Sequence, residues 1–171
     1  YERWLTPVKK LASSMGGSDF VPGRSPELFT LNGFSFGALV CYEGIFFRLC
    51  RDYKRMGADF LINITNDGWT DTYNGHFQHF SASVFRAVEN GLWVVRAGNT
   101  GASAIIDPAG RVTASMPILK KGSFTGSIDV TLNRKTFYET AGDVVLYIAS
   151  LFIVSIIVIS AVRRRSEGEG D

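Results

Sequence analysis

The segment from Val144 to Val162 contains no charged residue, and it constrains the fold more than any other part of the sequence. A helix of this length can span the hydrocarbon core of a bilayer, which is roughly 30 Å thick. A buried core helix is the alternative, but such a helix rarely lacks a polar face over this length. The arginines at 163–165 follow directly, and by the positive-inside rule they favour a cytoplasmic C-terminus. The sequence therefore predicts a domain at 1–143, a transmembrane helix at 144–162 and a cytoplasmic tail at 163–171.

The chain as a whole has the composition of an ordinary globular protein. It has 171 residues, of which 46% are hydrophobic and 20% charged, and its formal net charge is +2. This length allows one domain with a proper core, and the mild charge argues against nucleic-acid binding. The chain begins with Tyr1 rather than Met, and no signal peptide precedes a domain predicted to lie outside the membrane. We therefore expect a fragment of a longer protein whose upstream part supplies the export route.

Apolar runs and turn residues predict the secondary structure. Strands and helices alternate first and hairpins follow, which predicts a mixed α/β sandwich rather than a doubly wound parallel sheet. Asn32-Gly33 is a strong hairpin signal. We expect helices at 1–15, 45–56 and 77–90, and strands at 27–31, 35–41, 60–64, 93–97, 102–106, 111–116 and 123–130.

The stretch from Ser35 to Gly44 is the centre of the predicted site. An apolar run ends at Cys41, and the polar, sharply turning residues Tyr42 and Glu43 follow at once. The sheet holds a cysteine at a strand end rigidly, while the loop after it opens to solvent or substrate. We therefore predict that Cys41 is a nucleophile that carries an acyl group as a thioester. Glu43 is expected to orient the site or to pair with a lysine, and the alternative is a solvated turn carboxylate.

Cys50 is the other cysteine of the chain, so a disulfide with Cys41 is the alternative to a free nucleophile. Cys50 falls on the apolar face of the helix predicted at 45–56. The two Cβ atoms would have to meet across a turn and two helical turns. We expect a free Cys41 and a packed Cys50.

Two further loops should converge on Cys41 if their strands share one sheet with it, because ligands bind beyond the carboxyl ends of such strands. One loop contains Asn66 and Trp69, and the other begins at Asn99. Asparagine side chains and backbone amides there can build an oxyanion pocket, although both motifs also read as simple turns. We expect Trp69 either to pack down or to contact substrate or lipid.

His76 and His79 form a His-x-x-His pair, a spacing that can ligate zinc at the start of a helix. No third ligand stands at a suggestive spacing, so we predict no metal site. His79 is expected instead to make a hydrogen bond that holds its loop against the next helix. Arg86, Glu89 and Arg96 are expected to form a structural ion-pair set around that helix.

Several motifs occur in a fixed order, and the ordered set is more specific than any one of them. They are Val40-Cys41-Tyr42-Glu43, Asn63-Ile64-Thr65-Asn66-Asp67-Gly68-Trp69, Gly75-His76-Phe77-Gln78-His79, Phe85-Arg86-Ala87-Val88-Glu89-Asn90, Arg96-Ala97-Gly98-Asn99-Thr100-Gly101, Ile106-Asp107-Pro108-Ala109-Gly110 and Thr136-Phe137-Tyr138. Over roughly 34–162 the chain resembles the C-terminal half of bacterial apolipoprotein N-acyltransferases, membrane enzymes of the nitrilase superfamily.

The resemblance implies a nitrilase-like αββα sandwich on the periplasmic side of the bacterial inner membrane. It implies a Glu-Lys-Cys triad in which Cys41 matches the nucleophile, while Tyr42, Glu43 and Trp69 match further residues of the family's site. The implied reaction is ping-pong. The thiolate takes an acyl chain from a phospholipid, and the thioester then acylates the N-terminal amine of a diacylglyceryl-cysteine on a lipoprotein. The resemblance implies neither a metal nor an organic cofactor.

The chain departs from the family pattern upstream of Cys41. The family's lysine lies in a segment resembling Tyr-x-Lys-x-x-Leu-Val-Pro, whereas the segment 1–7 has Arg3 and no well-placed lysine. We therefore expect the triad Glu and Lys to lie outside these residues, and the chain alone to be catalytically incomplete. Two alternatives remain: a nitrilase-superfamily amidase or carbamoylase acting on small amides, and a non-catalytic membrane-anchored module in which Cys41 is structural.

Overall fold

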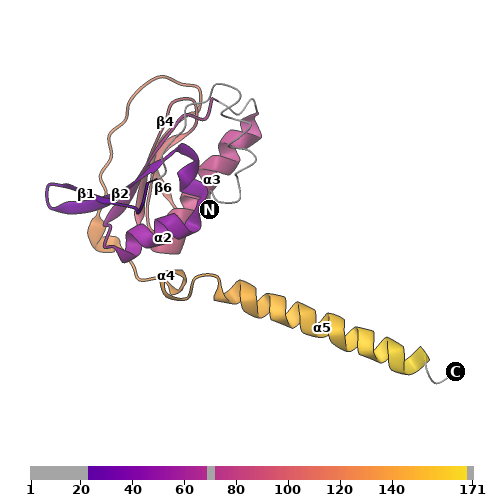
Figure 1. The fold of residues 1–171 in the computed structure, drawn as a ribbon. Coiled ribbons are helices and arrows are strands. Elements are labelled where there is room, and N and C mark those ends of the chain that lie inside the picture. The colour runs from indigo at the N-terminus through magenta and orange to yellow at the C-terminus, as the bar shows by residue number, and fades with distance from the viewer. Residues whose placement is uncertain (1–22, 69–71, 169–171) are drawn as a thin grey trace.

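A computed structural model describes residues 23–68 and 72–168, so the helix predicted at 1–15 and the position of Trp69 lie outside the described residues. The described residues form one six-stranded mixed sheet in which each strand neighbours the next in sequence (Figure 1). The three central strands β2, β3 and β4 are parallel, and the outer pairs are antiparallel. The strands are β1 (Leu28–Leu31), β2 (Phe34–Val40), β3 (Phe60–Thr65), β4 (Trp93–Gly98), β5 (Ser103–Ile106) and β6 (Val112–Met116).

The hairpin signal is confirmed. β1 and β2 pair antiparallel, with Leu31 opposite Phe34. The turn residues Asn32 and Gly33 have φ of 50° and 84°, the left-handed values that a two-residue hairpin turn requires. Glycine adopts such a φ without steric cost, and asparagine tolerates it better than most residues.

Two helices connect the parallel strands and cover one face of the sheet. These are α2 (Phe47–Arg55) and α3 (Tyr73–Asn90), close to the predicted helices. The core between helices and sheet contains buried apolar side chains from both layers, namely Leu39, Cys50, Tyr53, Leu61, Ala87, Leu92, Val94, Ala104 and Ile106. The packing fixes the carboxyl ends of β2, β3 and β4 side by side.

An irregular segment that includes residues 123–130 covers the opposite face of the sheet, so the prediction of a strand there is wrong. Phe124 and Ile128 pack on a second core that includes Phe60, Trp93 and Ile105. The indole Nε1 of Trp93 donates to the Asp129 carbonyl at 2.7 Å. The segment lies over the face of the sheet rather than along its edge, so its backbone does not join the ladder.

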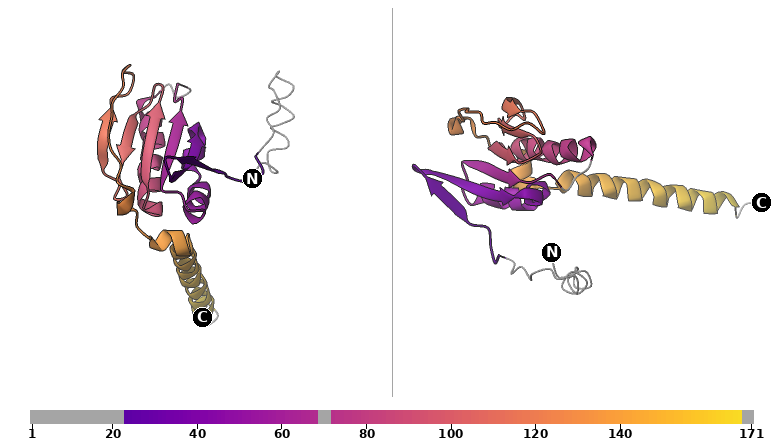
Figure 2. Two further views of the ribbon diagram at one scale, coloured as in Figure 1. Left: turned by 90° about the vertical axis from the view of Figure 1, so that its left-hand side faces the viewer. Right: turned by 90° about the horizontal axis from the view of Figure 1, so that it is seen from above.

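The chain leaves the sheet through two helices at its C-terminal end. The short helix α4 (Phe137–Ala141) contacts α2, with ring centroids of Phe47 and Tyr138 6.4 Å apart. Helix α5 (Val144–Gly168) then extends away from the sheet (Figure 2). Its segment Val144–Ala161 is long and apolar enough to cross a membrane, and none of that segment is buried against the rest of the molecule.

Candidate active site

Cys41 lies at a sharp turn directly after β2. It begins a 3₁₀ turn, η2 (Cys41–Ile45), and its φ is 51°. A side chain in this left-handed region costs of order 1 kcal/mol or more, and such residues gather at functional sites. Glu43 helps to hold the turn, because its Oε2 accepts a hydrogen bond from the Val40 amide at 2.7 Å. The strand therefore ends one residue earlier than predicted, and the turn presents the cysteine at the sheet edge.

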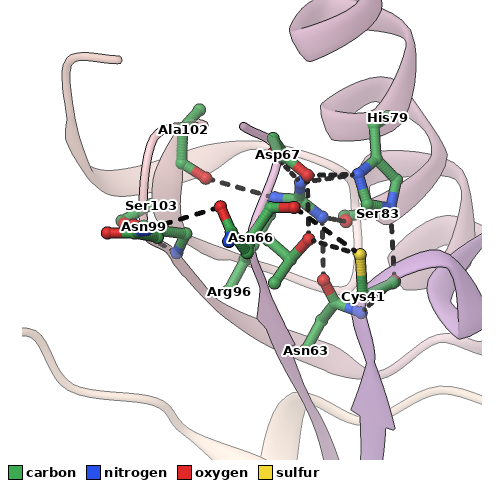
Figure 3. A network of polar contacts seen from close by, with 12 residues as sticks. Cys41, Asn63, Asn66, Asp67, His79, Ser83, Arg96, Asn99, Ala102 and Ser103 are labelled. Atoms are coloured by element: carbon green, nitrogen blue, oxygen red, sulfur yellow. Dashed lines mark hydrogen bonds and ion pairs between the residues drawn. The ribbon is translucent and has the colours of Figure 1, made fainter. Parts of the chain in front are cut away.

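The Cys41 side chain is partly exposed and has two polar neighbours among the described residues (Figure 3). The Thr65 hydroxyl lies 3.3 Å from the sulfur and the Asn66 carbonyl oxygen 3.9 Å from it. The Cys41 carbonyl points away from the sulfur. It accepts a hydrogen bond from Nδ2 of Asn63 at 3.1 Å and lies 3.2 Å from Nε2 of His79. Both the sulfur and the backbone of the cysteine are thus fixed by side chains of β3 and α3.

A buried ion pair lies beneath this turn. Arg96 of β4 and Asp67 of the loop after β3 are both completely buried, with Nη2 and Oδ2 2.7 Å apart. The guanidinium also donates to the Ala102 carbonyl at 3.1 Å, to Oδ1 of Asn63 at 2.8 Å and to Oγ of Ser83 at 3.2 Å. A buried charge is tolerated only when it is paired and its donors are satisfied, and this arrangement meets both conditions.

The Asp67 carboxylate is ionised in this setting. Burial alone would raise the pKa of Asp67, but the hydrogen bond from Thr65, the charge of Arg96 and the contacts with His79 outweigh it and hold that pKa below its usual range. Burial lowers the pKa of Arg96, and the Asp67 carboxylate opposes this. Because an arginine side chain stays protonated in proteins, the pair carries both charges.

His79 connects the ion pair to the nucleophile. Its Nδ1 lies 2.6 Å from Oδ1 of Asp67, and its Nε2 faces the Cys41 carbonyl. Nδ1 also lies 3.2 Å from Nη2 of Arg96, so the imidazole ring is held against both members of the ion pair. The structure shows the predicted hydrogen bond between His79 and its loop, and it adds a contact to Cys41 that sequence reasoning missed. His76 is buried on the same helix, but its Nδ1 has no partner among the described residues.

The two predicted loops meet at the site. Oδ1 of Asn66 accepts from the Gly68 amide at 3.1 Å and from Nδ2 of Asn99 at 3.4 Å. The loop after β4 approaches so closely that a Cβ on Gly101 would collide with Oδ2 of Asp67, which explains the glycine there. Asn66 presents its backbone carbonyl, rather than its side-chain amide, to the Cys41 sulfur.

The aromatic Tyr42 and the carboxylate of Glu43 lie on the exposed side of the turn. The Tyr42 ring stands 6.1 Å from the ring of Phe46 and 6.0 Å from that of His79. The described residues contain no group of three or more His, Cys, Asp or Glu side chains placed to hold a metal ion. Within the same residues, no glutamate or lysine side chain forms a hydrogen bond with the Cys41 sulfur.

The predicted ion-pair set is only partly correct. Arg86 and Glu89 do pair, at 2.9 Å, but Arg96 pairs with Asp67 instead. The sequence did contain a signal for the Arg96–Asp67 pair. Arg96 is a charged residue in an otherwise apolar strand, and such a residue needs a buried partner. In the sheet Arg96 lies opposite Asn63, which brings it under the loop that carries Asp67.

The two cysteines differ in accessibility, and neither is in a disulfide, as predicted. Cys50 is 0% exposed, and burial raises the pKa of its thiol to about 12. Because the thiolate is the reactive form, we expect iodoacetamide at pH 8 to alkylate Cys41 and to spare Cys50 until the protein is unfolded. Peptide mass spectrometry measures this, and a Cys41→Ser variant provides the control. Comparable labelling of both thiols in the folded protein would contradict the assignment.

Comparison with known proteins places the chain in a family. Residues 5–138 match the carbon-nitrogen hydrolase family. The chain is 38% identical to the apolipoprotein N-acyltransferase of Geobacter metallireducens over 93% of its own length and 30% of the relative's. It is 34% identical to that of Borreliella burgdorferi, over 79% of the chain and 26% of the relative.

A Saccharomyces cerevisiae member of branch 10 of the nitrilase superfamily has a similar fold. It is 23% identical to the chain, with a TM-score of 0.50 over 57% of this chain and 38% of the yeast protein. The predicted resemblance is confirmed, although the chain spans only about 30% of the length of the first relatives. Because the family match covers more than half of the chain, this protein belongs to the carbon-nitrogen hydrolase family, and apolipoprotein N-acyltransferases are among its relatives.

Proposed function

We propose that the protein transfers a fatty acyl chain from a phospholipid to the N-terminal amine of a diacylglyceryl-cysteine on apolipoproteins. In this proposal Cys41 carries the chain as a thioester between the two steps. The observation that carries the proposal is the position of Cys41: a partly exposed sulfur on a strained turn, held by β3 and α3, in a chain similar to N-acyltransferases. Thioester chemistry of this kind needs no metal or organic cofactor.

The first step is attack of the Cys41 thiolate on an ester carbonyl of the phospholipid, which releases a lysophospholipid. The negative charge then develops on the former carbonyl oxygen and requires hydrogen-bond donors. The Cys41 carbonyl points into the buried network. Because the peptide group is planar and trans, the Tyr42 amide points the opposite way, toward the exposed side of the turn. We propose this amide as one donor and Asn99, in the loop after β4, as a second.

The second step is attack of the lipoprotein amine on the thioester, which regenerates the thiolate. Both steps require a base and a positive charge near the sulfur. No hydrogen bond joins a glutamate or lysine of the described residues to the sulfur, and we propose that these groups come from outside the described residues. Glu43 holds the turn through the Val40 amide, which supports an orienting role rather than a role as that base.

The lipid nature of both substrates accounts for α5. Its apolar side chains are exposed along Val144–Ala161, which is unfavourable in water and favourable in hydrocarbon. We propose that α5 spans the bacterial inner membrane, with the sheet domain on the periplasmic side and the C-terminus in the cytoplasm. Trp69, the residue after Gly68 in the sequence, is proposed to contact lipid substrate.

The test is to trap the thioester. Membranes containing the protein, expressed from its intact gene, are incubated with a phospholipid whose acyl chain carries an alkyne. We expect the tag on the peptide that contains Cys41, and we expect neutral hydroxylamine to release it, because thioesters are cleaved under those conditions. A tag on another residue, or labelling by small amides and none by phospholipid, would refute the proposal, and the second result would favour an amidase.

A further inference from the structure

The Thr65 hydroxyl lies between the nucleophile and the buried carboxylate. Its Oγ1 is 3.3 Å from the Cys41 sulfur and 2.8 Å from Oδ1 of Asp67, and the residue is 5% exposed. A threonine hydroxyl has one proton and two lone pairs, whereas an ionised carboxylate can only accept. The contact with Asp67 therefore uses the proton, and a lone pair of Oγ1 then faces the sulfur.

This arrangement suits a thiol but not a thiolate. A Cys41 thiol can donate its S–H to the Asn66 carbonyl oxygen, while a thiolate can only accept and needs a donor. The other polar neighbour of the sulfur is the Asn66 carbonyl oxygen, which is itself an acceptor. Among the described neighbours of the sulfur, Thr65 is thus the group that can donate to a thiolate, after its hydroxyl turns about the Cβ–Oγ1 bond.

The Asp67 carboxylate can lose the hydrogen bond from the Thr65 hydroxyl because other donors still bind the carboxylate. Arg96 lies 2.7 Å from Oδ2, and Nδ1 of His79 lies 2.6 Å from Oδ1. Both contacts remain when the hydroxyl turns, so Asp67 is never left as an unpaired buried charge. No covalent bond changes at Thr65, since the hydroxyl keeps its proton throughout.

We propose that Thr65 is a further catalytic residue. Its hydroxyl donates a hydrogen bond to Asp67 while Cys41 is a thiol or thioester. When Cys41 is a thiolate, the hydroxyl turns and donates to the sulfur instead. The proposal rests on the proposed function in one respect, that Cys41 is the nucleophile. The thiolate occurs twice in that cycle, before it attacks the phospholipid and again when the acyl group leaves for the amine. A donor to the sulfur stabilises both occurrences.

The test compares Thr65→Val, which removes the hydroxyl at nearly constant volume, with Thr65→Ser, which keeps it. The readout is the rate of Cys41 alkylation by iodoacetamide as a function of pH, in the intact protein. Hydrogen bonds to charged groups are among the stronger ones, so we expect the rate at pH 7 to fall roughly tenfold in Thr65→Val and its pH profile to move up by about one unit. Thr65→Ser should stay within about threefold of the native rate.

Two controls make the test specific. Thr113→Val removes a hydroxyl that donates a hydrogen bond to the Ile105 carbonyl on β5, away from the site. This variant should leave the pH profile of Cys41 alkylation unchanged. Thr65→Ala is a second hydroxyl-free variant, and it should shift the profile in the same direction even if Thr65→Val packs poorly. Acyl-transfer kinetics add a further readout, in which we expect kcat to fall while KM for the phospholipid stays constant.

The alkylation assay needs no lipid, so it separates this proposal from the proposed function. An identical pH profile for the native protein, Thr65→Val and Thr65→Ala would overturn the role of Thr65, even if the thioester were trapped. A shifted profile that Thr65→Ser restores would support that role, even if no acyl transfer from phospholipid were found.

Discussion

Replacing Cys41 with alanine is expected to abolish acyl transfer, whereas the same substitution at Cys50 should leave it nearly intact. A nucleophile that forms the covalent intermediate has no substitute, so we expect a loss of at least roughly 10³-fold in kcat for Cys41→Ala. Cys50 is buried in the core beneath the sheet, so Cys50→Ala is expected to lower the free energy of unfolding by about 1 kcal/mol without changing the site. Transfer of a tagged acyl chain to a lipoprotein, measured in membranes, provides the comparison.

The stability of the two variants shows whether the loss is chemical. Cys41 is partly exposed and its sulfur contributes little to the core, so Cys41→Ala should unfold within a few degrees of the native protein. Cys41→Ser adds a second check, because a serine would give a more stable oxyester that neutral hydroxylamine does not cleave. Normal lipoprotein acylation by Cys41→Ala would exclude Cys41 as the nucleophile.

The sequence was sufficient for most of the sheet because local signals determine it. Apolar runs bounded by turn residues located β1 to β6 to within one or two residues, and the Asn32-Gly33 turn fixed the first pairing. The segment 123–130 shows the limit of such signals. Its apolar residues indicate that it packs on something, but they do not distinguish a ladder partner from a cover over the sheet face. The hydrogen bond from the Trp93 indole to the Asp129 carbonyl shows that the segment covers the sheet face, and this contact is not visible in the local sequence.

The candidate site was only partly predictable because its parts are distant in sequence. Cys41 and the two asparagine loops could be named from the rule that ligands bind beyond strand ends. The supporting network could not, because it joins β4, α3 and the loop after β3 through Arg96, His79 and Asp67. The strand register that sets Arg96 opposite Asn63 follows from packing rather than from any local motif.

Breaking the buried ion pair is expected to cost far more than breaking a pair of the same length whose arginine is exposed. The Arg96–Asp67 and Arg111–Asp107 pairs both have N–O distances of 2.7 Å, but the Arg96 side chain is 0% exposed and that of Arg111 is 77% exposed. Removing one partner of a buried pair leaves an uncompensated charge and costs roughly 3–5 kcal/mol, whereas exposed pairs contribute about 1 kcal/mol or less. We expect Arg96→Met to lower the thermal unfolding midpoint by the order of 10 °C and Arg111→Met by a few degrees at most.

The pH dependence of the same variants identifies the charge responsible. The pKa of Asp67 is held below its usual value, so its carboxylate stabilises the fold above about pH 4 and that contribution is lost as the pH falls through the folded pKa. Asp67→Asn combined with Arg96→Met removes both charges and should recover part of the stability lost in Arg96→Met. The double variant should also lose less stability than the native protein as the pH falls below about 4 and through the lowered folded pKa of that carboxylate. Two results would contradict the stabilising role of the buried pair beneath Cys41. One is an equal fall in the unfolding midpoint for Arg96→Met and Arg111→Met. The other is a loss of stability at low pH in the double variant that equals the loss in the native protein.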